Sequence, residues 1–198
     1  EAAQTAKPED VARIARDTWQ SATLRPSDEN EFTNRYGHFL TGQDHIARFD
    51  RILREGRAPV ARELLSKLPP DYQSLANARL AMATRAADAA SVLREVPAAK
   101  LNDPALRLER AQWLRRTGNL DEAKRTLTGS IASPTDAWWN ERNQLAREFL
   151  TANRPADAYA MTTGHGLTKG IAFAEAELLA GWLAFRHLKK PTDALKHF

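Results

Sequence analysis

Two histidines, His38 and His45, lie seven residues apart in the first third of the chain, with Asp44 and Asp50 nearby. Imidazole nitrogens and carboxylate oxygens are common metal ligands, and residues seven apart on one continuous helix share a face. Gly42 lies between the two histidines and favours a helix break, which would separate their side chains. We therefore interpret the pair as structural or surface histidines and predict no metal ligand.

Glu175 and Glu177 resemble the carboxylate pair of a general acid and base. Residues two apart on a helix point in nearly opposite directions, so these carboxylates cannot act on one substrate bond. We expect a structural role, with one of them a buried partner of an arginine, Arg142 or Arg186.

The other candidate groups offer no reaction centre. Ser130 and Ser133 have no matching histidine and aspartate, and Gly164-His165-Gly166 lacks the lysine and the strand of a phosphate loop. We interpret His165 as a turn residue. His187 and His197 lie near the ends of predicted helices, where a positive charge is favourable. The sequence predicts no catalytic residue, no cofactor-binding residue and no cofactor.

Trp113, Trp138, Trp139 and Trp182 lie within helical patterns, where aromatic side chains usually pack in the core. Trp138 and Trp139 are adjacent and so face different ways, because successive helical residues are separated by about 100°. One of these two is the candidate surface anchor for a sugar or a protein.

Arginines carry much of the net charge of +4, which results from 29 basic and 25 acidic residues. Two stretches, 48–62 and 107–116, are rich in them. We expect solvated helix faces in which these arginines pair with Glu55, Glu63, Glu109 and Asp121. A surface for an acidic polymer is the alternative. Acidic residues dilute the basic ones and no recognised motif is present, so the sequence predicts no nucleic-acid partner.

These residues must be positioned by a repeat of helical hairpins. Ala123, Ala158 and Ala194 open the second helix of successive predicted pairs, at spacings of 35 and 36 residues. A period in the mid-thirties is typical of a helical-hairpin solenoid of the tetratricopeptide kind. A short helix pair cannot bury its own apolar stripe, so neighbouring pairs stack and share a core.

Further columns accompany the alanines. Ala61 fits the pattern upstream and Ala89 fits it less well, so the array is irregular. Turn or polar residues precede the alanines by five and large apolar residues precede them by nine, whereas the position four residues later is apolar in only some copies. The residues five positions before the alanines are Gly56, Gly118, Asn153 and Lys189. Those nine positions before are Ile52, Leu80, Leu114, Phe149 and Phe185, and those four positions after are Leu65, Leu93, Leu127, Thr162 and Phe198.

The fold class predicted is all-α: an irregular superhelix of about twelve helices, each of roughly 10–20 residues. The chain is rich in Ala and Leu and poor in Val and Ile, which favours helices over strands. Pro8 opens the first predicted helix, Ser27 the second, and Ser133-Pro134 the helix before Trp138. The longest helix is expected at 168–188.

We expect residues 1–198 to form a single superhelical domain. No run of about 18 apolar residues predicts a membrane span. There is no cysteine, which excludes disulfides and thiolate metal sites and is compatible with a bacterial periplasm. The opening residues, EAAQTAKPED, do not resemble a signal peptide.

The segment from Trp138 onward resembles the superhelical N-terminal region of soluble lytic murein transglycosylases, in an alphaproteobacterial form. The similar pieces are WWNER at Trp138–Arg142, NRPADAY at Asn153–Tyr159, HGL at His165–Leu167 and FAEAELLAGWLAFRHLKKPTDALKHF at Phe173–Phe198. The resemblance is looser over Gln112–Leu127 and extends upstream only as a helical style.

The resemblance implies a periplasmic protein of Gram-negative bacteria that is associated with peptidoglycan. In this family a separate C-terminal domain with a lysozyme-like fold cleaves the MurNAc–GlcNAc bond, using a glutamate in an E-S motif that a G-L-M-Q segment follows. No Glu in this chain is followed by Ser, so no catalytic residue carries over. We expect a scaffold that is inactive alone and that positions a glycan strand or the catalytic domain.

A free-standing tetratricopeptide-like adaptor that binds proteins is the rival hypothesis. A complete solenoid closes with a polar capping helix, whereas this chain ends with the apolar residues Leu195 and Phe198. The sequence therefore favours a chain that continues into further helices and the catalytic domain. Reading the gene beyond Phe198 distinguishes the two hypotheses.

Overall fold

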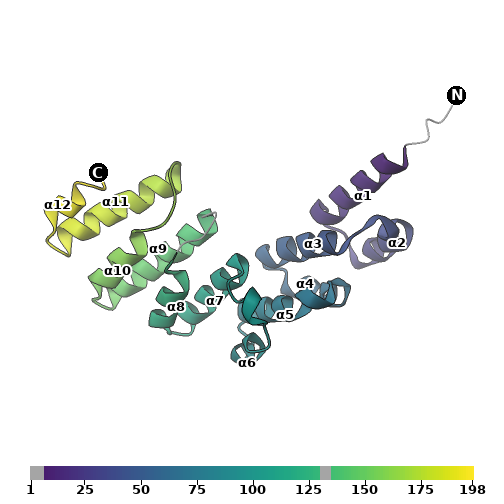
Figure 1. Cartoon of the computed structure of the whole chain (residues 1–198), viewed down its shortest axis with the longest axis horizontal. Helices are drawn as coiled ribbons and strands as arrows, with labels where there is room; N and C mark the ends of the chain where they lie inside the picture. Colours follow the sequence, from purple (N-terminus) through teal and green to yellow (C-terminus); the bar gives the residue numbers. More distant parts are fainter. Residues whose placement is uncertain (1–6, 130–134) are drawn as a thin grey trace. The chain divides into compact units, whose positions relative to one another are not determined.

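The protein is all-α in a computed structural model that describes residues 7–129 and 135–198. These residues form twelve α-helices and three short 3-10 helices (η) and contain no strand (Figure 1). The elements are α1 (Pro8–Ser21), α2 (Pro26–Tyr36), η1 (Gly37–Phe39), α3 (Gly42–Arg54), α4 (Ala58–Leu64), η2 (Leu65–Lys67), α5 (Pro70–Thr84), α6 (Ala89–Leu93), η3 (Ala98–Lys100), α7 (Pro104–Arg116), α8 (Leu120–Leu127), α9 (Asp136–Thr151), α10 (Pro155–Thr162), α11 (Ile171–Arg186) and α12 (Pro191–Ala194).

Prolines and capping side chains set the beginnings of the helices. Pro8 and Pro104 occupy first helical positions, where the missing N–H leaves no helical hydrogen bond unmade. The Asp103 carboxylate accepts from two backbone N–H groups of α7, and the Thr135 hydroxyl accepts from that of Trp138. The expected cap at Ser133-Pro134 lies outside the described residues.

Helix lengths differ from the expectation in two ways. The helix expected at 168–188 begins instead at Ile171, because Gly170 has a φ of 88° that a helix cannot contain. It has 16 residues, the same length as α9. The second helices of the hairpins are shorter than the expected range: α8 and α10 have eight residues each and α12 has four.

The repeat columns predicted from the sequence correspond to fixed structural roles. All five column alanines are buried. The residues five positions before four of them share a left-handed backbone: Gly56, Gly118, Asn153 and Lys189, with φ between 56° and 80°. In the less regular copy, Arg85 takes that conformation only four residues before Ala89. This explains why the sequence pattern is weakest there.

The left-handed residue ends one helix and turns the chain into the next. Behind Gly118, the N–H of Asn119 donates to the carbonyl oxygen of Leu114 at 2.8 Å. The N–H of Arg154 donates in the same way to Phe149, also at 2.8 Å. These 6→1 bonds define the Schellman motif, which satisfies carbonyls that a helix end leaves free.

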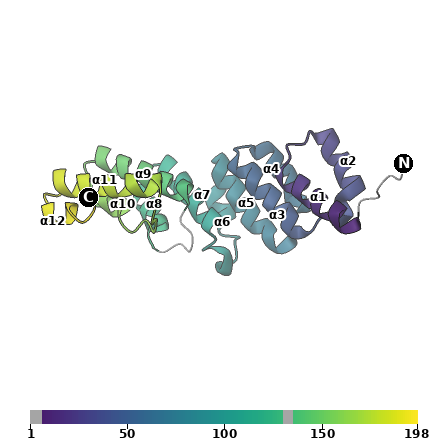
Figure 2. The same ribbon diagram turned by 90° about the horizontal axis from the view of Figure 1, so that it is seen from above.

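The described helices form two compact units, residues 1–97 and 98–198, each with its own core. In the first unit, α1 packs on α3 and α5 on α6, and Trp19, Phe49, Ile52 and Leu64 are fully buried. In the second, the hairpins α7–α8, α9–α10 and α11–α12 stack in order (Figures 1 and 2). Whether both units continue one superhelix stays a prediction.

Several arginines of the two basic stretches pair with acidic residues, as expected for mixed helix faces, although the expected partner Asp121 pairs with Arg154 instead. Arg51 and Arg57 pair with Glu55, and Arg110 pairs with Glu122. Arg48 differs because it is buried: it pairs with Glu29 at 3.0 Å and lies 4.4 Å over the ring of Trp19. Arg48 therefore lies within the first core rather than on a solvated helix face.

Candidate binding groove between α9 and α11

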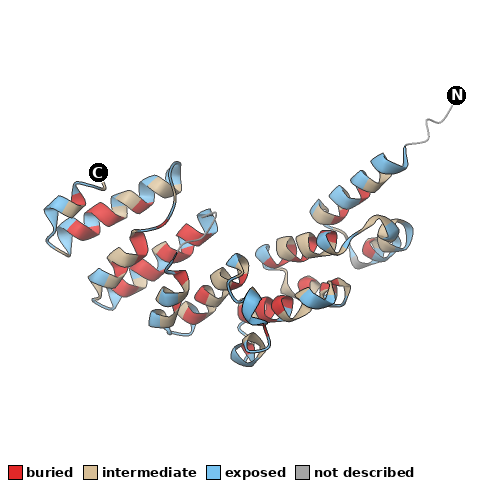
Figure 3. Ribbon diagram, in the orientation of Figure 1, coloured by how far each residue is buried: buried red, intermediate tan, exposed pale blue. Residues whose placement is uncertain are grey.

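The first helices of successive hairpins, α9 and α11, lie next to each other in the second unit. α9 also contacts α7, α8 and α10, so residues on more than one side of this helix are buried (Figure 3). The alternation of first and second helices brings α9 and α11 together although 19 residues separate the end of one from the beginning of the other. Side chains that line the space between them form the candidate site.

A buried arginine fixes the position of α9 against the second helices of two hairpins. The Arg142 guanidinium donates to the carbonyl oxygens of Leu127 at the end of α8 and of Met161, Ala160 and Thr163 at the end of α10. Burial lowers the pKa of Arg142 to about 10, so the side chain stays cationic at neutral pH. Its charge lies against the negative ends of two helices, which is the favourable orientation.

The same contact occurs one repeat earlier. Arg107 lies 35 residues before Arg142 and donates to the carbonyl oxygens of Thr126 and Thr128 at the end of α8. The sequence carries this signal as two arginines 16 residues before Ala123 and Ala158. Arg142 is one of the two arginines expected as the partner of a glutamate, but its guanidinium donates to backbone carbonyls instead.

Glu175 and Glu177 diverge as predicted, although neither pairs with an arginine. The indole N–H of Trp139 donates to Glu175 Oε2 at 3.2 Å, which links α9 to α11. Glu177 turns to the other side of α11 and receives hydrogen bonds from two histidines. The expectation of Arg142 or Arg186 as partner is therefore wrong, because Arg142 faces helix ends and Arg186 is exposed.

A hydrogen-bonded chain joins the two histidines, Glu177 and Tyr159. The N–H of Leu167 donates to His165 Nδ1, so His165 carries its hydrogen on Nε2 and donates it to Glu177. His197 Nδ1 donates to the other carboxylate oxygen, and the Tyr159 hydroxyl lies 2.9 Å from His197 Nε2. Burial alone would raise the pKa of Glu177, but the hydrogen bonds from His197 and His165 outweigh it and hold the pKa below its usual value.

His165 is thus more than the turn residue that was expected. It is 7% exposed, and with Glu177 it holds the loop 163–170 against α11. The predicted separation of His38 and His45 is confirmed: His38 lies in η1 and His45 in α3, with Gly42 as the first residue of α3. Residues 7–129 and 135–198 contain no group of three side chains that could hold a metal ion.

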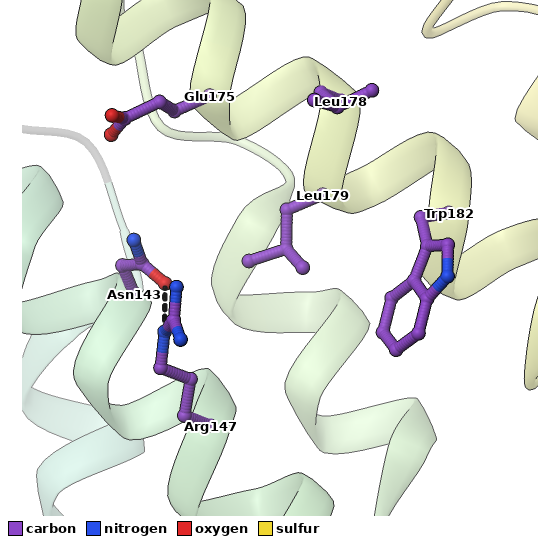
Figure 4. Close-up of a pocket in the computed structure, with 6 residues that line it drawn as sticks. All are labelled: Asn143, Arg147, Glu175, Leu178, Leu179 and Trp182. Carbon is purple, nitrogen blue, oxygen red and sulfur yellow. Dashed lines mark hydrogen bonds between the residues drawn. The ribbon is translucent and has the colours of Figure 1, made fainter.

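The groove itself has a volume of about 440 Å³ and lies between α9 and α11 (Figure 4). Asn143 and Arg147 line it from α9, one helical turn apart. Glu175, Leu178, Leu179 and Trp182 line it from α11. Figure 4 shows Trp182 at one end of the groove and the carboxylate of Glu175 toward the other, with Leu179 between them.

Trp182 is the exposed tryptophan of this face, at 44% exposure, and its ring packs edge-on against His187. Core packing, the usual role of aromatics at this spacing, is confirmed for Trp138 and Trp139, which are 3% and 1% exposed, so neither is the alternative surface anchor. The same expectation is wrong for Trp182. Trp138 faces the core and Arg107, whereas Trp139 faces α11. Both are buried because α9 has neighbours on either side, whereas this face of α11 is open within the second unit.

The groove combines an open aromatic ring with hydrogen-bonding groups of both kinds. An aromatic face supplies an apolar platform, and the amide, guanidinium and carboxylate groups supply directional donors and acceptors. Ligand sites usually combine apolar walls with a few polar groups in this way. A pyranose has an apolar C–H face and equatorial hydroxyls, so a sugar chain matches this arrangement.

Two curated relatives match part of the chain. Cellulose synthase operon protein C from Komagataeibacter sucrofermentans is 29% identical over an aligned length of 130 residues, which covers 57% of this chain and 10% of that protein. The protein of the same name from Komagataeibacter xylinus matches with the same identity and coverage. The chain thus spans about a tenth of the length of these relatives. No protein-family model matches the chain, and no solved structure matches it.

Proposed function

We propose that this chain is the superhelical scaffold region of a periplasmic lytic murein transglycosylase and that its α9–α11 groove holds a glycan strand. The resemblance in Trp138–Phe198 supports the family. The matched relatives are named for a cellulose synthase operon, which also supports a polysaccharide as the ligand class. Catalysis belongs to a separate domain of the full-length protein, which the scaffold positions against the strand.

The residues that carry the resemblance have structural roles, which supports a scaffold rather than a reaction centre. Arg142 of the WWNER segment binds the carbonyls of two helix ends. Asn153 of the NRPADAY segment takes the left-handed conformation, and Arg154 pairs with Asp157 and Asp121. His165 of the HGL segment holds its loop to Glu177.

The observation that carries the proposal is the exposed ring of Trp182 beside three polar side chains in one groove. Stacking of a sugar on an aromatic ring is a short-range contact that depends on the ring itself. The direct test is binding of soluble peptidoglycan glycan strands to the wild-type chain and to Trp182→Ala. We expect Trp182→Ala to weaken binding about tenfold, as the loss of about 1.5 kcal/mol implies.

Phe185→Ala is the matched control, because Phe185 is an exposed aromatic of the same helix that does not line the groove. It should leave glycan affinity unchanged. Equal loss in both variants, or no glycan binding by the wild-type chain, would contradict the proposal.

The assignment of catalysis to another domain has its own test. Incubation of this chain with purified peptidoglycan should release no 1,6-anhydro-muropeptides. Release of these products would show that the chain is active alone. Periplasmic localisation is tested by cell fractionation of the producing bacterium.

A protein-binding adaptor is the second candidate, and a specific observation favours it. Ile171, Phe185 and Leu195 are 81%, 60% and 75% exposed and lie outside the groove. All three belong to α11 or to the residue after α12, so the last hairpin offers apolar contacts to another protein. The adaptor hypothesis predicts that Phe185→Ala weakens capture of a protein partner, whereas Trp182→Ala has no such effect.

In residues 7–129 and 135–198, no helix has the length and apolar character that crossing a bilayer requires.

A further inference from the structure

Arg147 is held in the groove with its charge available to a ligand. Its Nε donates to the Asn143 side-chain oxygen at 3.1 Å, one turn earlier on α9 (Figure 4). Arg147 is exposed, and within the described part of the chain no carboxylate lies within ion-pair distance of it. The bond to Asn143 orients the guanidinium and leaves its two terminal nitrogens as donors.

Several neighbouring arginines of this unit are already neutralised. Arg115 pairs with Glu141 and Glu148, and Arg154 pairs with Asp121 and Asp157. Arg147 is the only cation among the groove-lining residues. A planar guanidinium fork is suited to a carboxylate, which it binds through two parallel hydrogen bonds.

Glu175 places a negative charge at its own end of the groove, where it disfavours a carboxylate on the ligand. Its Oε2 accepts from the Trp139 indole, which fixes the carboxylate in place. A carboxylate on the ligand is repelled there and attracted at Arg147, so the two charges define one orientation of a charged strand. The carboxylate of Glu175 remains an acceptor for sugar hydroxyls.

We propose that the groove prefers a glycan strand that carries carboxylates, with Arg147 binding a carboxylate while a sugar ring stacks on Trp182. The inference rests on the proposed function, because it specifies which glycan the groove takes. The lactyl ether of muramic acid places a carboxylate on every second sugar of a peptidoglycan strand. A neutral β-1,4-linked glycan of the same length offers the stacking surface without that charge.

The experiment compares two ligands on the full chain at low ionic strength. The first is a peptidoglycan glycan strand freed of its peptides, which keeps its lactyl carboxylates, and the second is chitohexaose. We expect the wild-type chain to bind the carboxylate strand roughly two- to fivefold more tightly, the effect of one exposed ion pair. Arg147→Gln should lose this preference, because its affinity for the carboxylate strand falls by more than its affinity for chitohexaose.

Arg186→Gln is the matched control, since Arg186 is an exposed arginine of α11 outside the groove. It removes the same charge, so a preference that arises from the net charge of the chain falls in both variants. That result would overturn the inference, as would equal affinity of the wild-type chain for both ligands. Equal weakening of both ligands by Arg147→Gln would also overturn it, because a structural role of Arg147 has that effect.

The two levels of the proposal fail in different ways. If both ligands bind equally and Trp182→Ala weakens both, the carboxylate inference is wrong and glycan binding stands. If neither ligand binds the wild-type chain, the proposed function itself is wrong.

Discussion

At the scale of single residues, buried polar side chains link helices that also share an apolar core. Arg142 shows this most clearly, because one guanidinium contacts the ends of α8 and α10 from a position on α9. Dispersion contacts among alanines and leucines are non-directional, whereas these hydrogen bonds specify one register. The cost of burying the charge is offset by four carbonyl acceptors.

Replacing Arg142 by Ala should lower the free energy of unfolding by about 3 kcal/mol, because it leaves buried carbonyls without a donor. Denaturant unfolding of the full chain measures this change. Arg107→Ala is the control, since Arg107 makes the equivalent contact from a half-buried position and should cost about 1 kcal/mol. Equal losses of stability in the two variants would contradict the argument that the cost depends on how deeply the arginine is buried.

Glu177 predicts a specific dependence of stability on pH. The pKa of Glu177 is lower in the folded chain than in the unfolded chain, where it is about 4.3. The ionised carboxylate therefore stabilises the fold at pH values above that unfolded pKa. That stability is lost as the pH falls through the lower folded value. Glu177→Gln should therefore be less stable than the wild type at pH 7, and the difference should shrink toward pH 3. Thermal unfolding at both pH values tests this, and a constant difference would refute it.

At the scale of the helices, the left-handed residue five positions before the column alanine is the element that defines each hairpin. Gly118 meets this requirement without strain, whereas Asn153 and Lys189 adopt it with a side chain. For a non-glycine residue the left-handed region costs roughly 1–2 kcal/mol, and asparagine tolerates it best. Lysine is thus an unfavourable residue type for the left-handed backbone at position 189.

Gly118→Ala should destabilise the chain by about 1 kcal/mol, and Lys189→Gly should stabilise it by a similar amount. No atom lies within 4 Å of a Cβ built at Gly118, so its cost arises from the backbone alone. Gly37→Ala is the control, because Gly37 has a φ of −57° and a Cβ built there meets only the Thr33 Cβ, at an ordinary contact distance of 4.0 Å. It should be neutral or slightly stabilising. Urea midpoints give all three values, and destabilisation by Lys189→Gly would contradict the argument.

The repeat pattern predicted the hairpins because its residues act locally or recur every 35 positions. The column alanines and left-handed turns are of this kind. The groove was not predicted, since exposure of Trp182 depends on which neighbour covers α11 rather than on its own helical spacing. The hydrogen bonds of Glu177 with His165 and His197 were also not predicted, because the three side chains come from a loop, a helix and the residues after α12.

At the scale of the whole molecule, the described residues form two units, each with its own apolar core. Trp19, Phe49 and Ile52 belong to the first core, and Leu145 and Phe149 belong to the second. In a stacked array, each hairpin is stabilised mainly by its nearest neighbours. A local loss of packing should therefore spread within one unit before it reaches the other.

Phe49→Ala and Phe149→Ala test this division, because both rings are fully buried, one in each core. Each substitution should cost about 3–5 kcal/mol within its own unit, since it removes a ring and leaves a cavity. Amide hydrogen exchange on the full chain reads the effect helix by helix. We expect Phe49→Ala to accelerate exchange in α3 and α5 while α9 and α11 stay protected, and Phe149→Ala to do the reverse. Equal acceleration in both units by either substitution would show that the chain unfolds as one cooperative body.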